Sequence, residues 1–282
     1  MIFNIADQLI EITGNFDYIK DDFYKFLYNN GDNEQADVVW KIKEGGFLIP
    51  DNAKNIFKSQ YYAIYKTDEK YYTRYPGYNY SFATEVEINS GNAIIYILEP
   101  AKKVDIAVSK SNFSFVLRDT FWERLRITNM LAIHSSTIIY KDKAYLFSAP
   151  SGTGKTTHTN MWVNYYNTEI LDGDMCICSA TEDKVYAYGS PWHGSSGKFL
   201  NKKVELGGII FLHQAKENYI KEMDSLNKII NIYYRNFIIP LCEEHITRLM
   251  KTASKIGERV LCVELYNRPE REAVEIIKKR ID

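Results

Sequence analysis

The first hundred residues alternate apolar and polar side chains in short runs separated by turn-forming residues. The strongest runs are rich in Tyr, Ile, Val and Phe, residue types favoured in strands. They occupy residues 38–42, 60–66, 80–88 and 92–99. Gly, Pro, Asn and Asp gather between them, at 31–33, 76–79 and 89–91. This pattern predicts a small, mostly antiparallel sheet, followed by a seam at 101–112.

The second part of the chain mixes helical and strand-like spacing. Apolar residues recur every three or four positions over 114–131, which predicts a helix. Two β-type runs, 136–140 and 144–147, flank Asp142 and predict a hairpin. Further strands are expected at 206–212 and 260–264. Further helices are expected at 224–237 and at 242–256, where Gly257 would end the second one. A last helix is expected to follow a cap at Asn267 and to run to Ile281. We therefore predict an α/β protein with an N-terminal β-rich domain, residues 1–105, and a second domain, residues 106–282.

Composition excludes several classes of protein. The 282 residues include 35 Lys and Arg against 36 Asp and Glu, a net charge of −1. This balance argues against nucleic acid as a partner and against a polybasic membrane binder. The N-terminus lacks the features of a signal peptide, and no apolar run is long enough to cross a bilayer. Four cysteines without a C-x-x-C pair suit a reducing compartment, so we expect a cytoplasmic protein.

One strand–loop–helix unit carries candidate chemistry. Residues 149–156 read Ala-Pro-Ser-Gly-Thr-Gly-Lys-Thr, which matches the phosphate-binding pattern G-x-x-x-x-G-K-[ST] except that Ala149 replaces the first Gly. Gly152 and Gly154 allow successive backbone N–H groups to converge on phosphate oxygens, and the following helix adds its positive dipole. The alternative is a Gly-Thr-rich turn that binds nothing.

The pattern gives each loop residue an expected role toward ATP and Mg²⁺. Lys155 is expected to reach the β- and γ-phosphates, and the Thr156 hydroxyl is expected to ligate Mg²⁺. The expected nucleotide ligands are Ser151, Gly152, Thr153, Gly154, Lys155, Thr156 and Thr157.

Two carboxylates follow the next apolar run. Ile170 and Leu171 lead into Asp172 and Asp174, which share a face if the backbone is extended. One of them can hold Mg²⁺ while the other takes a proton from an attacking hydroxyl. The residues alone leave open which of the two takes each role. The alternative is a solvated Asp-Gly turn.

At these residues the sequence resembles the HPr kinase / phosphoenolpyruvate carboxykinase superfamily. Residues 151–157, Ser-Gly-Thr-Gly-Lys-Thr-Thr, look like the carboxykinase loop, and the order of strand, His134, hairpin, loop, helix and paired acids looks like the HPr kinase core. The segments 131–136 and 188–192 look like HPr-kinase-like proteins associated with peptide modification. The resemblance covers roughly 130–215 and implies a P-loop kinase domain of this type.

The resemblance also implies roles for residues that local patterns leave open. The family has a histidine at the place of His134, so an imidazole there is expected to orient a carboxylate or the γ-phosphate, or to act as a base; otherwise His134 is a core or turn histidine. Segment 189–198 is polar and Gly-rich, and it either closes over the nucleotide, binds the acceptor or is an ordinary surface loop.

Two departures from the family pattern bear on the acceptor. HPr kinase has two adjacent aspartates, whereas Gly173 separates Asp172 from Asp174 here. If Asp174 keeps the metal, the base role moves to Asp172 or lapses, with His134 as the other candidate. The signature by which HPr kinase engages HPr is not seen, and a carboxykinase needs a much longer chain.

The sequence thus predicts an ATP-dependent kinase that transfers a phosphoryl group to a hydroxyl, with Asp172, His134 and Lys155 as catalytic residues. The acceptor is expected to be a serine of a peptide or protein, or a small hydroxy compound; the resemblance favours a peptide. A nucleotide-binding switch or accessory protein without transfer, and a hydrolase that uses water, are the alternatives. Relatives of this kind often assemble, so a homo-oligomer is also possible.

Overall fold

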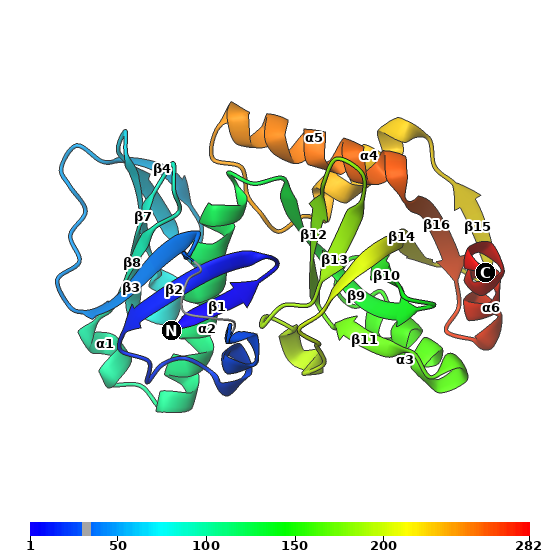
Figure 1. Ribbon diagram of the computed structural model, residues 1–282, viewed down its shortest axis with the longest axis horizontal. Helices are drawn as coiled ribbons and strands as arrows, with labels where there is room; N and C mark the ends of the chain where they lie inside the picture. The colour runs from blue at the N-terminus through cyan, green and yellow to red at the C-terminus, as the bar shows by residue number, and fades with distance from the viewer. Residues whose placement is uncertain (30–34) are drawn as a thin grey trace. The chain divides into compact units, whose positions relative to one another are not determined.

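The computed structural model describes residues 1–29 and 35–282, so the turn predicted at 31–33 lies outside the described residues. The protein is a mixed α/β protein with two large sheets, each of eight strands (Figure 1). The chain divides into two compact units, Met1–Thr128 and Asn129–Asp282.

The first unit is built on one sheet with the strand order β1-β2-β3-β8-β7-β6-β5-β4. Its strands are β1 (Ile2–Ile5), β2 (Gln8–Gly14), β3 (Val38–Glu44), β4 (Lys54–Lys58), β5 (Ala63–Lys66), β6 (Lys70–Arg74), β7 (Phe82–Glu87) and β8 (Ala93–Ile97). Only the β2–β3 and β3–β8 pairings are parallel among those of this sheet in the described residues. The sheet is therefore mostly antiparallel, as predicted, but larger than the pattern indicated.

The sequence analysis did not predict strands β1, β2, β4 and β6, for reasons that lie in their local sequence. The β1–β2 hairpin turns at Ala6 and Asp7, both at positive φ, without the Asn-Gly or Asp-Gly pair that normally marks such a turn. β4 is an edge strand whose side chains are mostly exposed, so it lacks an alternating apolar face. Pairing with neighbours, rather than local pattern, makes these segments strands.

Helix α2 (Ile106–Leu125) belongs to the first unit, so the boundary between the units lies later in the chain than predicted. The helix starts within the predicted seam, where the Asp105 carboxylate accepts hydrogen bonds from the N–H groups of Ala107 and Val108. Phe121 packs against Trp40 of the sheet, with ring centroids 6.4 Å apart. Burial of these aromatic rings joins α2 to the first sheet, so the compact units divide after Thr128 and not at the predicted 105/106. The short helices of this unit are η1 (Asp21–Phe26), η2 (Pro76–Tyr78) and α1 (Glu99–Lys102).

The second unit contains the other sheet, with the order β10-β9-β12-β13-β14-β16-β15 and with β11 paired to β9. Its strands are β9 (Met130–Tyr140), β10 (Lys143–Ser148), β11 (Glu169–Asp172), β12 (Met175–Ala180), β13 (Val185–Tyr188), β14 (Lys203–Gln214), β15 (Tyr219–Glu222) and β16 (Leu261–Asn267). β10 also pairs with β14 in parallel, so the strands β10, β9, β12, β13 and β14 close into a ring.

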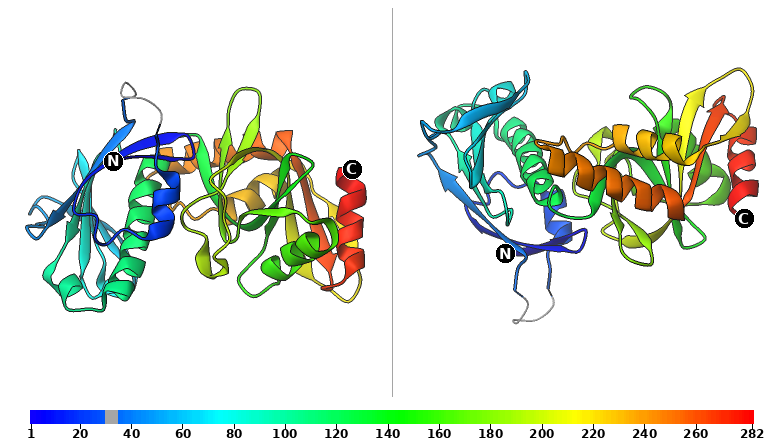
Figure 2. Two further views of the ribbon diagram at one scale, coloured as in Figure 1. Left: turned by 60° about the horizontal axis from the view of Figure 1, so that its bottom comes forward. Right: turned by 90° about the horizontal axis from the view of Figure 1, so that it is seen from above.

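The helices of the second unit cover both sides of its sheet. They are α3 (Lys155–Tyr166), η3 (Gly194–Ser196), α4 (Ser225–Tyr234), α5 (Glu243–Arg259) and α6 (Arg271–Ile281). Figures 1 and 2 show α3 and α5 on opposite sides of the sheet. Trp162 of α3 and Ile277 of α6 share one apolar core with Phe147, Ile210 and Val263 of the central strands.

The structure confirms the predicted β9–β10 hairpin and corrects two helix ends. Lys141 and Asp142 form its two-residue turn, both at positive φ. Helix α5 continues through Gly257 to Arg259, because Gly257 lies against Lys228 and Ile232 of α4 and serves close packing instead of termination. Asn267 is the last residue of β16, paired with Gln214, so α6 begins only at Arg271.

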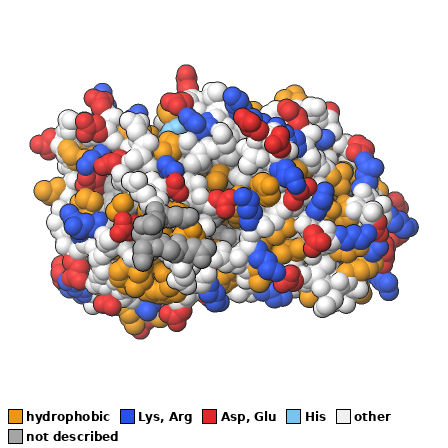
Figure 3. Space-filling model, viewed as in Figure 1, with side chains coloured by type: hydrophobic (Ala, Val, Ile, Leu, Met, Phe, Trp, Pro, Cys, Tyr) orange, Lys and Arg blue, Asp and Glu red, His pale blue; other side chains and the backbone are white. Residues whose placement is uncertain are grey.

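The surface carries charges of both signs. Figure 3 shows Lys and Arg side chains interspersed with Asp and Glu on the face turned to the viewer. Within residues 1–29 and 35–282, no helix combines the length and apolarity that crossing a bilayer requires.

Trp162 provides a test of the core beneath the candidate site. Its side chain is fully buried, and its ring lies 5.2 Å from Tyr140 and 6.1 Å from Phe147. We expect Trp162→Ala to lower the free energy of unfolding by about 3–5 kcal/mol, measured by urea denaturation. Leu226→Ala, at an exposed position of α4, should change it by less than about 0.5 kcal/mol. Equal effects would contradict this account of the core.

Candidate active site

The loop between β10 and α3 has the strand–loop–helix setting expected from the sequence. Gly152 and Gly154 have φ of 78° and 111°, in the left-handed region that residues with a Cβ rarely adopt. Gly154 is the N-cap of α3, and the first N–H groups of a helix have no partner within the helix. The loop therefore presents backbone donors and the positive end of the α3 dipole at one place.

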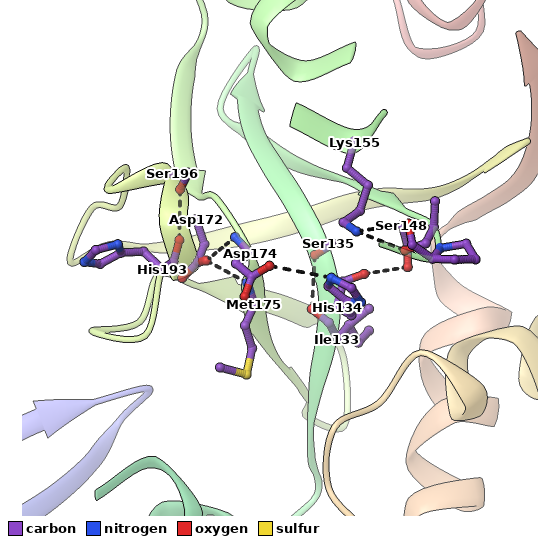
Figure 4. A network of polar contacts seen from close by, with 12 residues as sticks. Ile133, His134, Ser135, Ser148, Lys155, Asp172, Asp174, Met175, His193 and Ser196 are labelled. Atoms are coloured by element: carbon purple, nitrogen blue, oxygen red, sulfur yellow. Dashed lines mark hydrogen bonds and ion pairs between the residues drawn. The ribbon is translucent and has the colours of Figure 1, made fainter. Parts of the chain in front are cut away.

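Lys155 lies folded across this loop. Its side chain is only 8% exposed, and Nζ donates to the carbonyl oxygens of Ala149 at 3.0 Å and Pro150 at 3.4 Å (Figure 4). Burial lowers the pKa of Lys155; the Asp174 carboxylate opposes this effect, and the charge of Arg235 adds to it. A buried cation held only by neutral carbonyls is well placed to exchange them for an anion.

A cavity of about 450 Å³ opens beside the loop. It is lined by His134, Ser151, Gly152, Gly154, Lys155, Thr156, Thr157, Gly173, Asp174 and Ser196. The structure thus brings together most of the residues predicted from the sequence. Thr153 and Asp172 are the exceptions in the described lining.

His134 and Asp174 form the wall that faces the loop. β9 pairs with β12, with His134 opposite Met175, and the Ser135 N–H donates to the Asp174 carbonyl at 3.0 Å. This pairing places His134 Nε2 3.5 Å from Asp174 Oδ1 (Figure 4). The histidine and the second aspartate therefore lie side by side in the lining of the cavity.

Asp172 occupies a different environment from the one predicted. Its carboxylate is fully buried; Oδ1 accepts the N–H groups of Asp174 and Met175, and Oδ2 accepts the N–H and hydroxyl of Ser190. Burial raises the pKa of Asp172 to about 7, although these donors favour the ionised form. With both oxygens occupied, this side chain supports the turn that presents Asp174. Base catalysis by Asp172 stays a prediction from the sequence.

Arg235 is a candidate site residue that the sequence analysis missed. It follows α4, and its carbonyl accepts the N–H of His134 at 2.8 Å. Its Nε is buried without a hydrogen-bond partner, and no carboxylate in the described parts of the chain forms an ion pair with it. Its charge is close enough to lower the pKa of Lys155. No local pattern marks this arginine, since pairing of residues 235–237 with β9 puts it in place.

Segment 193–197 packs tightly against the acidic turn. A Cβ added to Gly173 would lie 1.8 Å from Ser196 Oγ, and one added to Gly194 would lie 2.6 Å from the carboxyl carbon of Asp174. Glycine at these positions therefore allows a close approach that other residues would prevent. Trp192, which precedes this segment, is buried, and it is not among the described residues that line the cavity.

A second cavity, of about 330 Å³, lies on the other side of the loop. The two cavities share Gly152, Gly154 and Thr157. The second is also lined by Met161 of α3 and by the segment Asn267–Pro269 after β16. The loop is therefore bordered by one mainly polar cavity and by a second whose lining mixes apolar side chains, such as Met161 and Pro269, with polar ones, such as Gln214 and Arg268.

The chain's own donors fit a metal that arrives with phosphates. Among residues 1–29 and 35–282, no three His, Cys, Asp or Glu side chains gather as a metal site. Mg²⁺ bound with a nucleotide needs only one or two protein oxygens, because phosphates and water supply the rest. Thr156 and Asp174 line one cavity and offer such oxygens.

Comparisons with known proteins add little to the geometry. No protein-family model and no curated protein matches the sequence. Among solved structures, the HPr(Ser) kinase/phosphatase from Coxiella burnetii is similar over 53% of this chain and 95% of its own, with 8% sequence identity and a TM-score of 0.32. This is a weak likeness in the path of the backbone, so function has to be inferred from the site's own residues.

Asp172→Asn tests whether the buried carboxylate supports the turn. An amide has one oxygen and one NH2 group, so it leaves the donors from Ser190 without an acceptor. We expect a loss of about 2–4 kcal/mol in the free energy of unfolding at pH 8, measured by urea denaturation. A variant as stable as the wild type would contradict the supporting role.

The pH dependence of that loss follows from the raised pKa. In the folded protein Asp172 titrates near pH 7, whereas in the unfolded chain it titrates near 4. Protonation of Asp172 therefore adds up to about 4 kcal/mol to the free energy of unfolding of the wild type. This contribution is complete below pH ~4 and is lost as pH rises through 7. The gap between wild type and Asp172→Asn should therefore be larger at pH 5 than at pH 8. A smaller gap at pH 5 would mean that the four donors outweigh burial.

Proposed function

We propose that this protein is a kinase that transfers the γ-phosphoryl group of Mg²⁺-ATP to a hydroxyl acceptor. One observation carries the proposal: a single cavity has the loop with Lys155 on one wall and the His134–Asp174 pair on the other. Phosphoryl transfer needs little covalent help from the protein, and positioned charges supply most of the catalysis.

The loop is proposed to hold the phosphates. N–H groups of residues 151–157 would surround the β-phosphate, and Lys155 would leave the carbonyls of Ala149 and Pro150 for the β- and γ-phosphate oxygens. The nucleoside would lie in the second cavity, between Met161 and Pro269, because that cavity continues from the same loop residues. Met161 and Pro269 would offer apolar surface to the face of a base, and the polar residues of the same lining would meet its edge.

Thr156 and Asp174 are proposed to hold Mg²⁺, which when bound neutralises charge on the phosphates. His134 then remains beside the Asp174 carboxylate, where it can orient that carboxylate or take the proton of the acceptor hydroxyl. Asp172 would act through the turn it supports. This arrangement keeps the metal and proton roles on the wall opposite the loop.

Arg235 is proposed to neutralise the phosphoryl group during transfer. Its guanidinium has no carboxylate partner among the described residues and lies within electrostatic reach of Lys155. Charge spreads over the equatorial oxygens of the group in flight, and an arginine beside it stabilises that charge.

Nucleotide binding is tested with Lys155→Ala. Loss of a buried cation on the phosphates should weaken ATP binding by about 10- to 100-fold in isothermal calorimetry with MgCl₂ present. Lys251→Ala, on the exposed side of α5, is the matched control and should bind as the wild type does. Unchanged affinity in Lys155→Ala would remove the phosphate assignment.

Transfer is tested with Arg235→Ala. We expect the rate of ADP formation, measured with water as the acceptor, to fall by at least about 100-fold. Arg235→Lys should have an intermediate rate, because lysine keeps the charge but not the planar fork. Arg280→Ala, exposed on α6, should leave ADP release unchanged. Equal rates in wild type and Arg235→Ala would place the arginine outside the reaction.

The alternatives differ in where the γ-phosphate goes. γ-labelled ATP incubated with serine-containing peptides separates them. Label on a peptide supports the kinase, label only in inorganic phosphate supports a hydrolase, and binding without turnover supports a nucleotide-binding switch.

A further inference from the structure

The cavity beside the loop contains a hydroxyl that the proposed kinase reaction does not use. Ser151, Thr156 and Thr157 belong to the phosphate loop, whereas Ser196 enters the described lining from segment 193–197. Ser196 therefore places a hydroxyl on the wall opposite the loop, where the proposed reaction would bind its acceptor.

Ser196 is held at that wall by close packing. It ends the short helix η3, with Gly194 and Gly197 on either side at φ of 62° and 66°. Its Oγ lies against Gly173, between the two aspartates in sequence, and Gly194 lies against the Asp174 carboxyl group. The serine is therefore presented next to the residues proposed to hold the metal and the proton.

The direction of approach suits an acceptor. In-line displacement requires the attacking oxygen on the side of the γ-phosphorus away from the departing diphosphate. In Figure 4 the side chains of Ser196 and Lys155 lie to either side of the Asp174 carboxylate. A triphosphate held by Lys155 and the loop would extend its γ-phosphate toward the wall with Asp174 and Ser196.

The present hydrogen bonds of Ser196 are local. Oγ donates to the His193 carbonyl at 2.9 Å and accepts the Lys198 N–H at 3.3 Å. Both partners lie in the same turn, so rotation of one side chain frees the hydroxyl without breaking contacts between elements. A purely structural role as a turn-capping serine predicts no phosphate on this residue.

We propose that Ser196 is phosphorylated by the nucleotide bound in its own chain. This inference rests on the proposed phosphate binding by the loop. Ser196 Oγ forms a bond to the γ-phosphorus, the bond from that phosphorus to the oxygen bridging to the β-phosphate breaks, and ADP leaves. The serine proton passes to the His134–Asp174 pair.

The modification has a consequence for the site itself. A phosphoserine carries a charge of about −1.5 to −2 and three strong acceptor oxygens. Placed in this cavity, it competes with the γ-phosphate for Lys155, which lines the same cavity. The phosphorylated chain therefore binds ATP more weakly than the unmodified chain.

The test incubates the purified full chain with Mg²⁺ and γ-labelled ATP and locates the label by peptide mass spectrometry. Label on Ser196, formed at a rate independent of protein concentration, is the expected result. Ser196→Ala should lose the label, and Ser196→Thr should carry phosphothreonine at the same position. Ser225→Ala, at an exposed serine of α4, is the control and should be labelled as the wild type is.

Calorimetry on the same samples separates the two proposals. ATP binding with label on another residue, or with no label on the chain, overturns the Ser196 proposal and leaves the phosphate site standing. No ATP binding by the wild type overturns both. A labelling rate that rises with protein concentration overturns transfer within one chain.

Discussion

The second unit depends on the pairing of β9 with its neighbours on both sides. β9 pairs with β10 along one edge and with β11 and β12 along the other, and most of its residues are buried. The pairing with β10 directs the chain into the loop before α3, and the pairing with β12 places His134 beside the acidic turn. A strand fixed on both sides cannot shift register without exposing its apolar residues, so the distance between loop and acids is set by the sheet.

The two cations of the site, Lys155 and Arg235, form no ion pair with a carboxylate among the described residues. Lys155 is buried against carbonyls, and Arg235 has no carboxylate partner among the described residues. Burial is the main cause that lowers the pKa of Lys155; the Asp174 carboxylate opposes this effect, and the charge of Arg235 adds to it. An anion beside Lys155 would offset the cost of burying this cation, and this is the electrostatic basis of the proposed phosphate binding.

Asp172 shows how the wall opposite the loop keeps its shape. Its four hydrogen bonds join the end of β11, the start of β12 and the segment after β13. Gly173 separates the two aspartates and has no Cβ, so it also leaves room for the segment that carries Ser196.

The sequence by itself determined the mixed α/β class, the β9–β10 hairpin and the strand–loop–helix unit around Lys155, because these depend on short-range periodicity, turn residues and glycine positions. It also indicated that Asp174 and His134 belong near the loop. Only the tertiary structure decided that α2 belongs with the first sheet, that Asp172 is buried under four donors, that Ser196 lines the cavity and that Arg235 lies within electrostatic reach of Lys155. Those outcomes depend on pairing and packing between residues far apart in the chain, for which no local pattern exists.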